Sequence, residues 1–201
     1  MDKSPEALAQ AVLGRIFIEL EDSARHVHLT EAQAQALFGH GLTQDRPLSQ
    51  PGQFLARERV DLVGPKGTIC RFAVLGPARK EAQVEISVTD GRLLGIRPPV
   101  RQSGDVAGTP GILLSSSRER IAIREGVIAA RRHVHLTPET AERFHVTDGQ
   151  TVQLQTFTQR PTIFQDVVVR VSRDFADRAH LDLDEANACG MEPGDLGRIL
   201  S

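Results

Sequence analysis

Two copies of a histidine pair are the most chemically informative feature of this sequence. His26 and His28 are separated by one residue, and His133 and His135 repeat that spacing. On a β-strand, residues i and i+2 point to the same face, so each pair presents two imidazoles side by side. Imidazole is a common ligand of zinc and similar metals. The spacing predicts metal binding; the alternative is that local hydrogen bonds satisfy the four imidazoles.

The histidine pairs lie within a longer repeat. Arg25–Thr30 has the sequence RHVHLT, and Arg132–Thr137 repeats all six letters in the second half of the chain. Each threonine is placed to cap a helix, which in the first copy is expected over Glu31–Phe38 and in the second starts at Pro138. The repeat therefore predicts two related modules, and a twofold duplication favours convergence of both histidine pairs on one interface between them.

Further ligands are needed if the site is catalytic. Four imidazoles complete a single tetrahedral metal, whereas a catalytic metal keeps an open position, and two metals require more ligands. His180 is the best remaining histidine, because His40 and His145 lie at expected helix ends. Glu85 is the best carboxylate, since it lies between apolar neighbours on an expected strand. The alternative for Glu85 is an ordinary glutamate that faces solvent.

Three arginines lie close to these candidate ligands in the sequence. Arg79 precedes the strand that carries Glu85, and a guanidinium beside metals binds an oxyanion through two parallel hydrogen bonds. The alternative is a surface arginine. Arg25 and Arg132 precede the two histidine pairs and are weaker candidates for the same role, because their side chains are expected on the opposite face from the histidine that follows.

The remaining pattern predicts many short strands and few helices. Val84–Thr89 alternates between apolar and polar residues, and Asp90-Gly91 follows as a turn into Arg92–Ile96, so a hairpin is expected there. Thr151–Gln155 and Val167–Val171 are expected to form further strands. A chain of this kind is typical of small barrels or sandwiches.

Composition excludes several classes of protein. The chain has 201 residues, 40% hydrophobic and 25% charged, with a formal net charge of −2. That balance disfavours a protein that covers nucleic-acid phosphates, and the absence of an 18-residue apolar run disfavours a membrane span. The first residues lack the pattern of a secretory signal, and two cysteines are too few for a disulfide scaffold. We therefore expect a protein of the reducing cytoplasm.

At this point the motifs resemble a known family, the PduL-type phosphate propanoyltransferases, which are the phosphotransacylases of bacterial microcompartments. The similarity covers nearly the whole chain from Ser23 onward and involves several motifs in the same order. The motifs are SARHVHL at 23–29, GPAR at 76–79, QVEIS at 83–87, SGD at 103–105, TPG at 109–111, AARRHVHL at 129–136, HLD at 180–182 and DEAN at 184–187.

The resemblance implies a two-zinc enzyme that interconverts acyl-CoA and phosphate with acyl phosphate and CoA. It implies that Arg79 binds phosphate and that Ser23 and Asn187 lie near the coenzyme A site. Carried over position by position, the ligands of one zinc are His26, His28 and His180, and those of the other are Glu85, His133 and His135.

The resemblance also implies a mostly β fold of two small β-barrel domains, capped by short α-helices and interleaved in sequence. Residues 15–24 with 131–201 form the first barrel, 25–130 form the second, and 1–14 are an N-terminal extension. The family usually has Asn at the position of Ala24 and Thr at that of Ala82. Neither residue is an implied ligand, so these departures affect local geometry or substrate detail.

We expect direct acyl transfer without a serine or cysteine nucleophile. The expected partners are acyl-CoA and phosphate, a second copy of the chain in a homodimer, and the shell proteins of a microcompartment; nucleic acid and membrane are not expected. The location would be the cytoplasm or the interior of a microcompartment involved in propanediol degradation. Two alternatives remain: a zinc hydrolase acting on thioesters or phosphoesters, and a scaffold protein with structural zinc.

Overall fold

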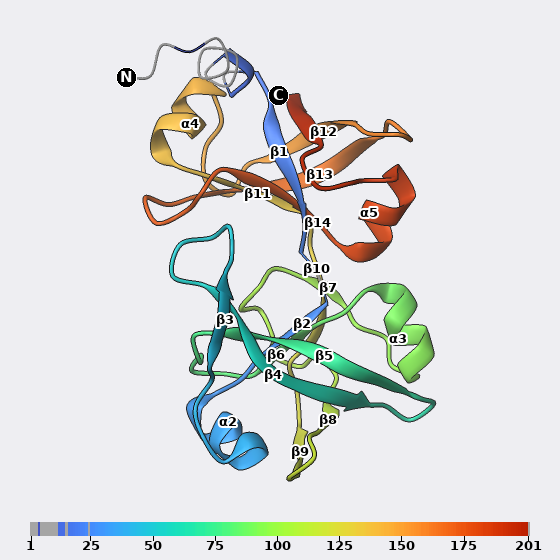
Figure 1. Ribbon diagram of the computed structural model, residues 1–201. Coiled ribbons are helices and arrows are strands. Elements are labelled where there is room, and N and C mark those ends of the chain that lie inside the picture. The colour runs from blue at the N-terminus through green and yellow to red at the C-terminus, as the bar shows by residue number, and fades with distance from the viewer. Residues whose placement is uncertain (1–3, 5–11, 15, 24, 201) are drawn as a thin grey trace. The chain divides into compact units, whose positions relative to one another are not determined.

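A computed structural model describes residues 4, 12–14, 16–23 and 25–200 of the chain (Figure 1). Contacts between residues divide the chain into two compact units. Unit 1 comprises Met1–Asp22, Arg132–Leu181 and Glu185–Ser201, and unit 2 comprises Ser23–Arg131 and Asp182–Asp184. The departure at Ala24 lies outside the described residues, as does most of the N-terminal extension, 1–14.

Unit 1 is a closed barrel with the strand order β1-β14-β11-β13-β12-β15. In Figure 1, β1 is the blue strand among the orange and red strands of the second half of the chain. Leu20, Val134 and Leu154 are among the buried residues of its apolar core. The strands are β1 (Ile18–Asp22), β11 (His133–Leu136), β12 (Thr151–Phe157), β13 (Ile163–Val171), β14 (Arg178–Leu181) and β15 (Leu196–Leu200).

Unit 2 is built on a nine-stranded sheet with the order β7-β10-β6-β2-β5-β4-β8-β9, in which β3 pairs with β4. Val27, Val74 and Val84 of its three central strands lie in a second apolar core. The strands are β2 (His26–His28), β3 (Gln44–Pro47), β4 (Phe54–Val63), β5 (Thr68–Gly76), β6 (Gln83–Glu85), β7 (Val100–Arg101), β8 (Ile112–Ser115), β9 (Arg120–Ile123) and β10 (Val127–Ala130).

The helices that follow the histidine pairs begin where the sequence predicts. Helix α2 (Glu31–Phe38) starts after Thr30, whose side chain accepts a hydrogen bond from the Gln33 amide, and it ends at Gly39 in the left-handed region. Helix α4 (Pro138–Arg143) starts after Thr137 in the same way. Because a cap satisfies amides that have no partner within the helix, local sequence suffices to place these ends.

The predicted hairpin over 84–96 is wrong. β6 ends at Glu85, and Val88–Leu94 forms helix α3. Ser87 caps this helix, and the Asp90 side chain accepts a hydrogen bond from the Ser87 amide in return. The polar pair expected to form a turn therefore belongs to the first turn of a helix, which ends at Gly95 with a φ of 80°.

The prediction of a mostly β fold with short helices is confirmed, as a closed six-stranded barrel in unit 1 and a curled half-barrel sheet in unit 2. A fourth described helix, α5 (Leu183–Cys189), follows β14. Within the described part of the chain, no helix is long and apolar enough to cross a membrane.

Candidate metal centres

Strand register places a third ligand candidate beside each histidine pair. In unit 2, β2 pairs antiparallel with β6, and His26 lies opposite Glu85. In unit 1, β11 pairs antiparallel with β14, and His133 lies opposite His180. Directly opposed residues have adjacent side chains on one face of a sheet, so each unit gathers a three-residue cluster. We call these the His26 cluster (His26, His28 and Glu85) and the His133 cluster (His133, His135 and His180).

The atoms of the His26 cluster lie at separations that suit one metal ion. The Nε2 atoms of His26 and His28 are 3.1 Å apart, and His26 Nε2 lies 3.6 Å from Glu85 Oε1. Two nitrogen ligands of a tetrahedral zinc ion lie about 3.3–3.4 Å apart, since each zinc–nitrogen bond is about 2.0–2.1 Å. All three side chains are buried.

The His26 ring is oriented by a hydrogen bond on the side away from the cluster. Its Nδ1 atom lies 3.0 Å from the Ser23 carbonyl oxygen. A carbonyl only accepts hydrogen bonds, so Nδ1 carries the proton and Nε2 offers a lone pair to the cluster. An outer hydrogen bond of this kind fixes the tautomer of most histidine ligands. Burial, followed by the neighbouring charges of His26 and Arg79, lowers the pKa of His28 to about 2, so that imidazole is neutral and able to bind a metal.

The His133 cluster contains an imidazole whose polar atoms have no protein partner. Both ring nitrogens of His135 are buried without a hydrogen bond from the described residues. Its ring centroid lies 4.6 Å from that of His133 and 4.9 Å from that of His180. Phe175 stacks on the other side of the ring at 4.1 Å. Burial lowers the pKa of His135 to about 3, so the ring is neutral and one of its two nitrogens offers a lone pair to a metal.

Both donor sets fit zinc. Two imidazoles with a carboxylate, or three imidazoles, are the protein ligands of catalytic zinc ions that keep a fourth position open. The unpaired nitrogens of His135 support this fit, because buried polar atoms otherwise have partners. The resemblance implied that His180 completes the first pair and Glu85 the second. Within each unit the strand register groups them differently, with Glu85 in the His26 cluster and His180 in the His133 cluster.

Arg79 lies on the polar side of the His26 cluster. It is half-buried, its Nη1 donates to Ser103 Oγ at 3.3 Å, and its charge contributes to the lowered pKa of His28. The planar guanidinium is thus held close to a cluster of candidate ligands by its own hydrogen bond. This arrangement is suited to binding an oxyanion.

Gln83 is a buried member of this region to which the sequence analysis assigned no role. Its Nε2 donates to Glu85 Oε1 at 2.5 Å and to Ser103 Oγ at 2.9 Å, while its Oε1 accepts from the Gly104 amide at 2.7 Å. The sequence feature that could have identified Gln83 is its position two residues before Glu85, which places both side chains on the same face of the strand. Gln83 therefore joins the Glu85 carboxylate to the loop that contacts Arg79.

The two residues implied to lie near coenzyme A belong to different units. Ser23 contributes its carbonyl to the His26 ring, and Asn187 is exposed on α5 in unit 1, the helix that follows the strand of His180.

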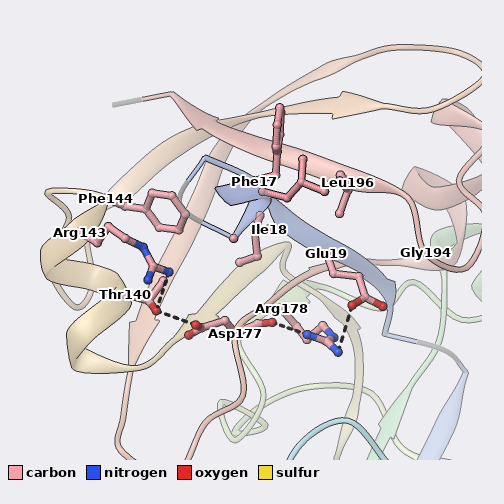
Figure 2. A pocket seen from close by; sticks show the side chains of 12 residues that line it. Phe17, Ile18, Glu19, Thr140, Arg143, Phe144, Asp177, Arg178, Gly194 and Leu196 are labelled. Carbon is pink, nitrogen blue, oxygen red and sulfur yellow. Dashed lines mark hydrogen bonds and ion pairs between the residues drawn. The ribbon is translucent and has the colours of Figure 1, made fainter. Parts of the chain in front are cut away.

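Unit 1 also contains a separate cavity of about 670 Å³, shown in Figure 2. Its polar residues are engaged with one another: Arg178 pairs with Glu19 at 3.1 Å, and Asp177 accepts a 2.6 Å hydrogen bond from Thr140. Among the described residues that line it, none belongs to either cluster. One lining residue, Arg178, lies opposite His135 in the register of β11 and β14, so the cavity and the His133 cluster share a strand pair.

Comparison with known proteins decides the family. The model of the phosphate propanoyltransferase family matches residues 19–192. The chain belongs to this family. A phosphate propanoyltransferase of Listeria monocytogenes is 51% identical over 97% of this chain and 92% of its own length. One from Clostridioides difficile is 45% identical over 100% and 99%, and one from Thermotoga maritima is 50% identical over 89% and 86%.

Membership of this family confirms the predicted family and the predicted class of enzyme, an acyltransferase. The family match begins inside β1 and ends beyond α5, so it covers both clusters and every strand of unit 2.

Proposed function

We propose that the chain interconverts a short-chain acyl-CoA, propanoyl-CoA or acetyl-CoA, and phosphate with acyl phosphate and CoA, with one zinc ion in each cluster. The observation that carries the proposal is the pair of three-donor clusters, buried except for the half-buried His133, at equivalent register positions in a chain of the phosphate propanoyltransferase family. The six proposed ligands are His26, His28, Glu85, His133, His135 and His180.

In the proposed reaction, Arg79 binds and orients the phosphate. A guanidinium donates two parallel hydrogen bonds, so it can fix two phosphate oxygens while a third attacks the thioester carbonyl. The new bond joins that oxygen to the acyl carbon, the carbon–sulfur bond breaks, and CoA leaves as the thiolate. Bound zinc would supply positive charge that stabilises the oxyanion and thiolate. Gln83 and Ser103 hold the Glu85 carboxylate and Arg79 in place, as their hydrogen bonds indicate.

We further propose that Ser23 and Asn187 contact coenzyme A. Each is close in sequence to one cluster: Ser23 holds the ring of His26, and Asn187 lies on the helix after His180.

The same family resemblance supports a homodimer that works inside a bacterial microcompartment, where shell proteins are its neighbours and propanediol degradation supplies its substrate.

The proposed domains, 15–24 with 131–201 and 25–130, are supported by the division of the contacts into two units. The extension, 1–14, lies mostly outside the described residues.

An assay of CoA release tests the proposal against the zinc hydrolase. Acetyl-, propanoyl- and longer acyl-CoAs are incubated with the zinc-loaded protein, with and without phosphate, and acyl phosphate is measured separately. The proposed reaction requires phosphate and yields one acyl phosphate for each CoA. Release of CoA without phosphate, and without acyl phosphate, would favour the hydrolase; no release in either condition, with zinc bound, would favour a structural role.

A further inference from the structure

An arginine in each unit forms the same contact relative to the cluster of that unit. Arg25 directly precedes the first histidine pair, and its Nη1 lies 3.0 Å from Asp90 Oδ1. Arg132 directly precedes the second pair, and its Nη1 lies 2.5 Å from Glu185 Oε1. Asp90 comes five residues after Glu85, and Glu185 comes five residues after His180. The contact therefore recurs at equivalent positions of the duplicated fold.

In unit 2, the carboxylate joins the two strands of the His26 cluster. One oxygen of Asp90 accepts from Arg25, and the other accepts from the Ser87 amide at 3.2 Å. Ser87 lies two residues after Glu85 and is the cap of α3. The Asp90 side chain is buried, with 4% of its surface exposed. Through this one side chain, the residue before His26 is fixed to the backbone just beyond Glu85.

In unit 1, the arginine makes contacts with two elements besides its own strand. Its Nη1 binds Glu185 on α5, and its Nε donates to the Gln165 carbonyl of β13 at 2.6 Å. The guanidinium also lies over the Phe164 ring, 5.9 Å from its centre. These contacts use separate donors of one rigid, planar group, which a lysine cannot reproduce. The residue before His133 is thus fixed to the helix that follows His180.

We infer that Arg25 and Arg132 are positioning residues of the two metal centres. Each sets the distance between a histidine pair and the third ligand, by fixing the start of the helix that follows the third ligand's strand. The inference rests on the proposed zinc binding at the clusters. Contacts outside the ligand shell orient ligands, and losing one lowers metal affinity about tenfold to hundredfold. Removing Arg25 leaves the buried Asp90 carboxylate without its ion-pair partner, which also costs folding stability, so the unfolding of the metal-free variants separates that cost from the effect on zinc binding.

The experiment measures zinc affinity by chelator competition on the full chain, first stripped of metal and then reloaded. The variants are Arg25→Gln, Asp90→Asn and their double, and Arg132→Gln, Glu185→Gln, Arg132→Lys and the Arg132→Gln/Glu185→Gln double. Arg101→Gln is the matched control, because Arg101 forms a 2.9 Å ion pair with Asp105 that is exposed on both sides and distant in sequence from the ligands. Thermal unfolding of each metal-free variant is recorded alongside.

We expect each single change to weaken one zinc site about tenfold to hundredfold, and each double to weaken it no further than its singles, because both partners serve one contact. Arg132→Lys should resemble Arg132→Gln. Wild-type affinity in both arginine variants, a loss no larger than in Arg101→Gln, or a loss of unfolding temperature alone, would overturn the inference. If the wild-type protein binds no zinc, the proposed function itself fails. If the wild-type protein binds zinc and the arginine variants keep its affinity, only the inference about the arginines fails.

Discussion

The His26 and His133 clusters share one scaffold and differ in the residue that completes them. In both units, the histidine strand lies between an antiparallel and a parallel neighbour, so that His26 is opposite Glu85 and Ala73, and His133 is opposite His180 and Val168. The scaffold fixes where the third side chain lies, and the residue type sets its charge. Glu85 would neutralise one of the two charges of Zn²⁺, whereas His180 would neutralise none.

The side chains that surround the two clusters also differ. Arg79 and Gln83 lie beside the His26 cluster, where Gln83 donates to the Glu85 carboxylate and Arg79 donates to Ser103. The His133 cluster has the Phe175 ring against His135, and the Arg170 guanidinium lies 5.6 Å from the centre of that ring. The two clusters therefore share the arrangement of their three side chains and differ in their neighbours, which are Arg79 and Gln83 at one and Phe175 and Arg170 at the other.

Removing one histidine from each cluster is the change with the largest expected effect. His28→Ala and His135→Ala should each abolish turnover, because each removes a ligand from one of two centres that serve one reaction. Metal analysis should show loss from the altered unit and retention in the other. His40→Ala is the control, since His40 is exposed and belongs to neither cluster. Full metal occupancy in both cluster variants would refute the ligand assignment.

Glu85→Gln separates the two clusters by charge. The amide keeps the shape of the carboxylate and removes its charge, so zinc affinity should fall at least as far as the loss of an outer contact, about tenfold to hundredfold. The exposed neighbour Glu81 provides the matched control, as Glu81→Gln. Zinc titration and turnover are the measurements. Wild-type values for both in Glu85→Gln would make Glu85 a bystander and leave the His26 cluster without its third ligand.

Arg79→Lys tests whether the anion site belongs to unit 2. Lysine keeps the charge but loses the planar fork, so the change should not behave as conservative. A charge-assisted hydrogen bond of roughly 1.5–3 kcal/mol corresponds to about a tenfold to hundredfold loss in rate constant. The loss should appear chiefly in the phosphate dependence of the steady-state rate, with zinc content unchanged and with Lys80→Ala as control. An unaltered phosphate dependence in both Arg79→Lys and Arg79→Ala would remove the arginine from the site.

Gln83→Leu addresses the contacts that only the His26 cluster has. Leucine fills similar space but deprives the Gly104 amide and the Glu85 carboxylate of their partner. We expect zinc affinity to fall about tenfold, the lower end for an outer contact. Gln102→Leu changes an exposed neighbour of the same loop and should leave zinc affinity intact. Equal affinities in the two variants would show that Gln83 does not orient Glu85.

The helix caps are the feature most alike in the two units, and the effect expected from them is the smallest. Thr30→Ala and Thr137→Ala should each lower the free energy of unfolding by about 1 kcal/mol, the usual cost of a lost cap. Thr30→Ala removes only the bond from the Gln33 amide, because the Gln33 side chain still accepts from the backbone amide of residue 30. Thr137→Ala should cost slightly more, because it also removes the hydrogen bond from Thr137 Oγ1 to Thr140 Oγ1. Denaturant unfolding measures both against Thr151→Ala, on an exposed strand position. No loss in either variant would contradict the assigned caps.

Much of the scaffold was predictable because its signals are local. A threonine followed by a suitable residue three positions on identifies α2 and α4, and the alternation of the histidine pairs places two imidazoles on one face. The error at α3 has a local cause as well. The alternating apolar residues from Val84 to Val88 masked a capping box formed by Ser87 and Asp90, which ends the strand at Glu85.

The grouping of the ligands and the role of Gln83 depend on contacts that no local pattern encodes. Glu85 joins His26 through pairing of strands almost sixty residues apart in sequence. Gln83 acquires its role from a loop that begins twenty residues later, at Ser103. Register and loop position are set by packing of the whole unit, so the sequence pointed to six candidate ligands but not to their grouping by strand pairing.

The path of the chain through the two units has a consequence for synthesis on the ribosome. β1 leaves the ribosome early, yet both of its neighbours in the barrel, β14 and β15, lie near the other end of the chain. Unit 2 is nearly continuous in sequence and can therefore fold first. The apolar residues Ile18 and Leu20 of β1 stay unpaired until the last strands have been translated. During that interval β1 presents an open strand edge to other nascent chains, so closure of the barrel is the step at which this protein is most exposed to misassembly.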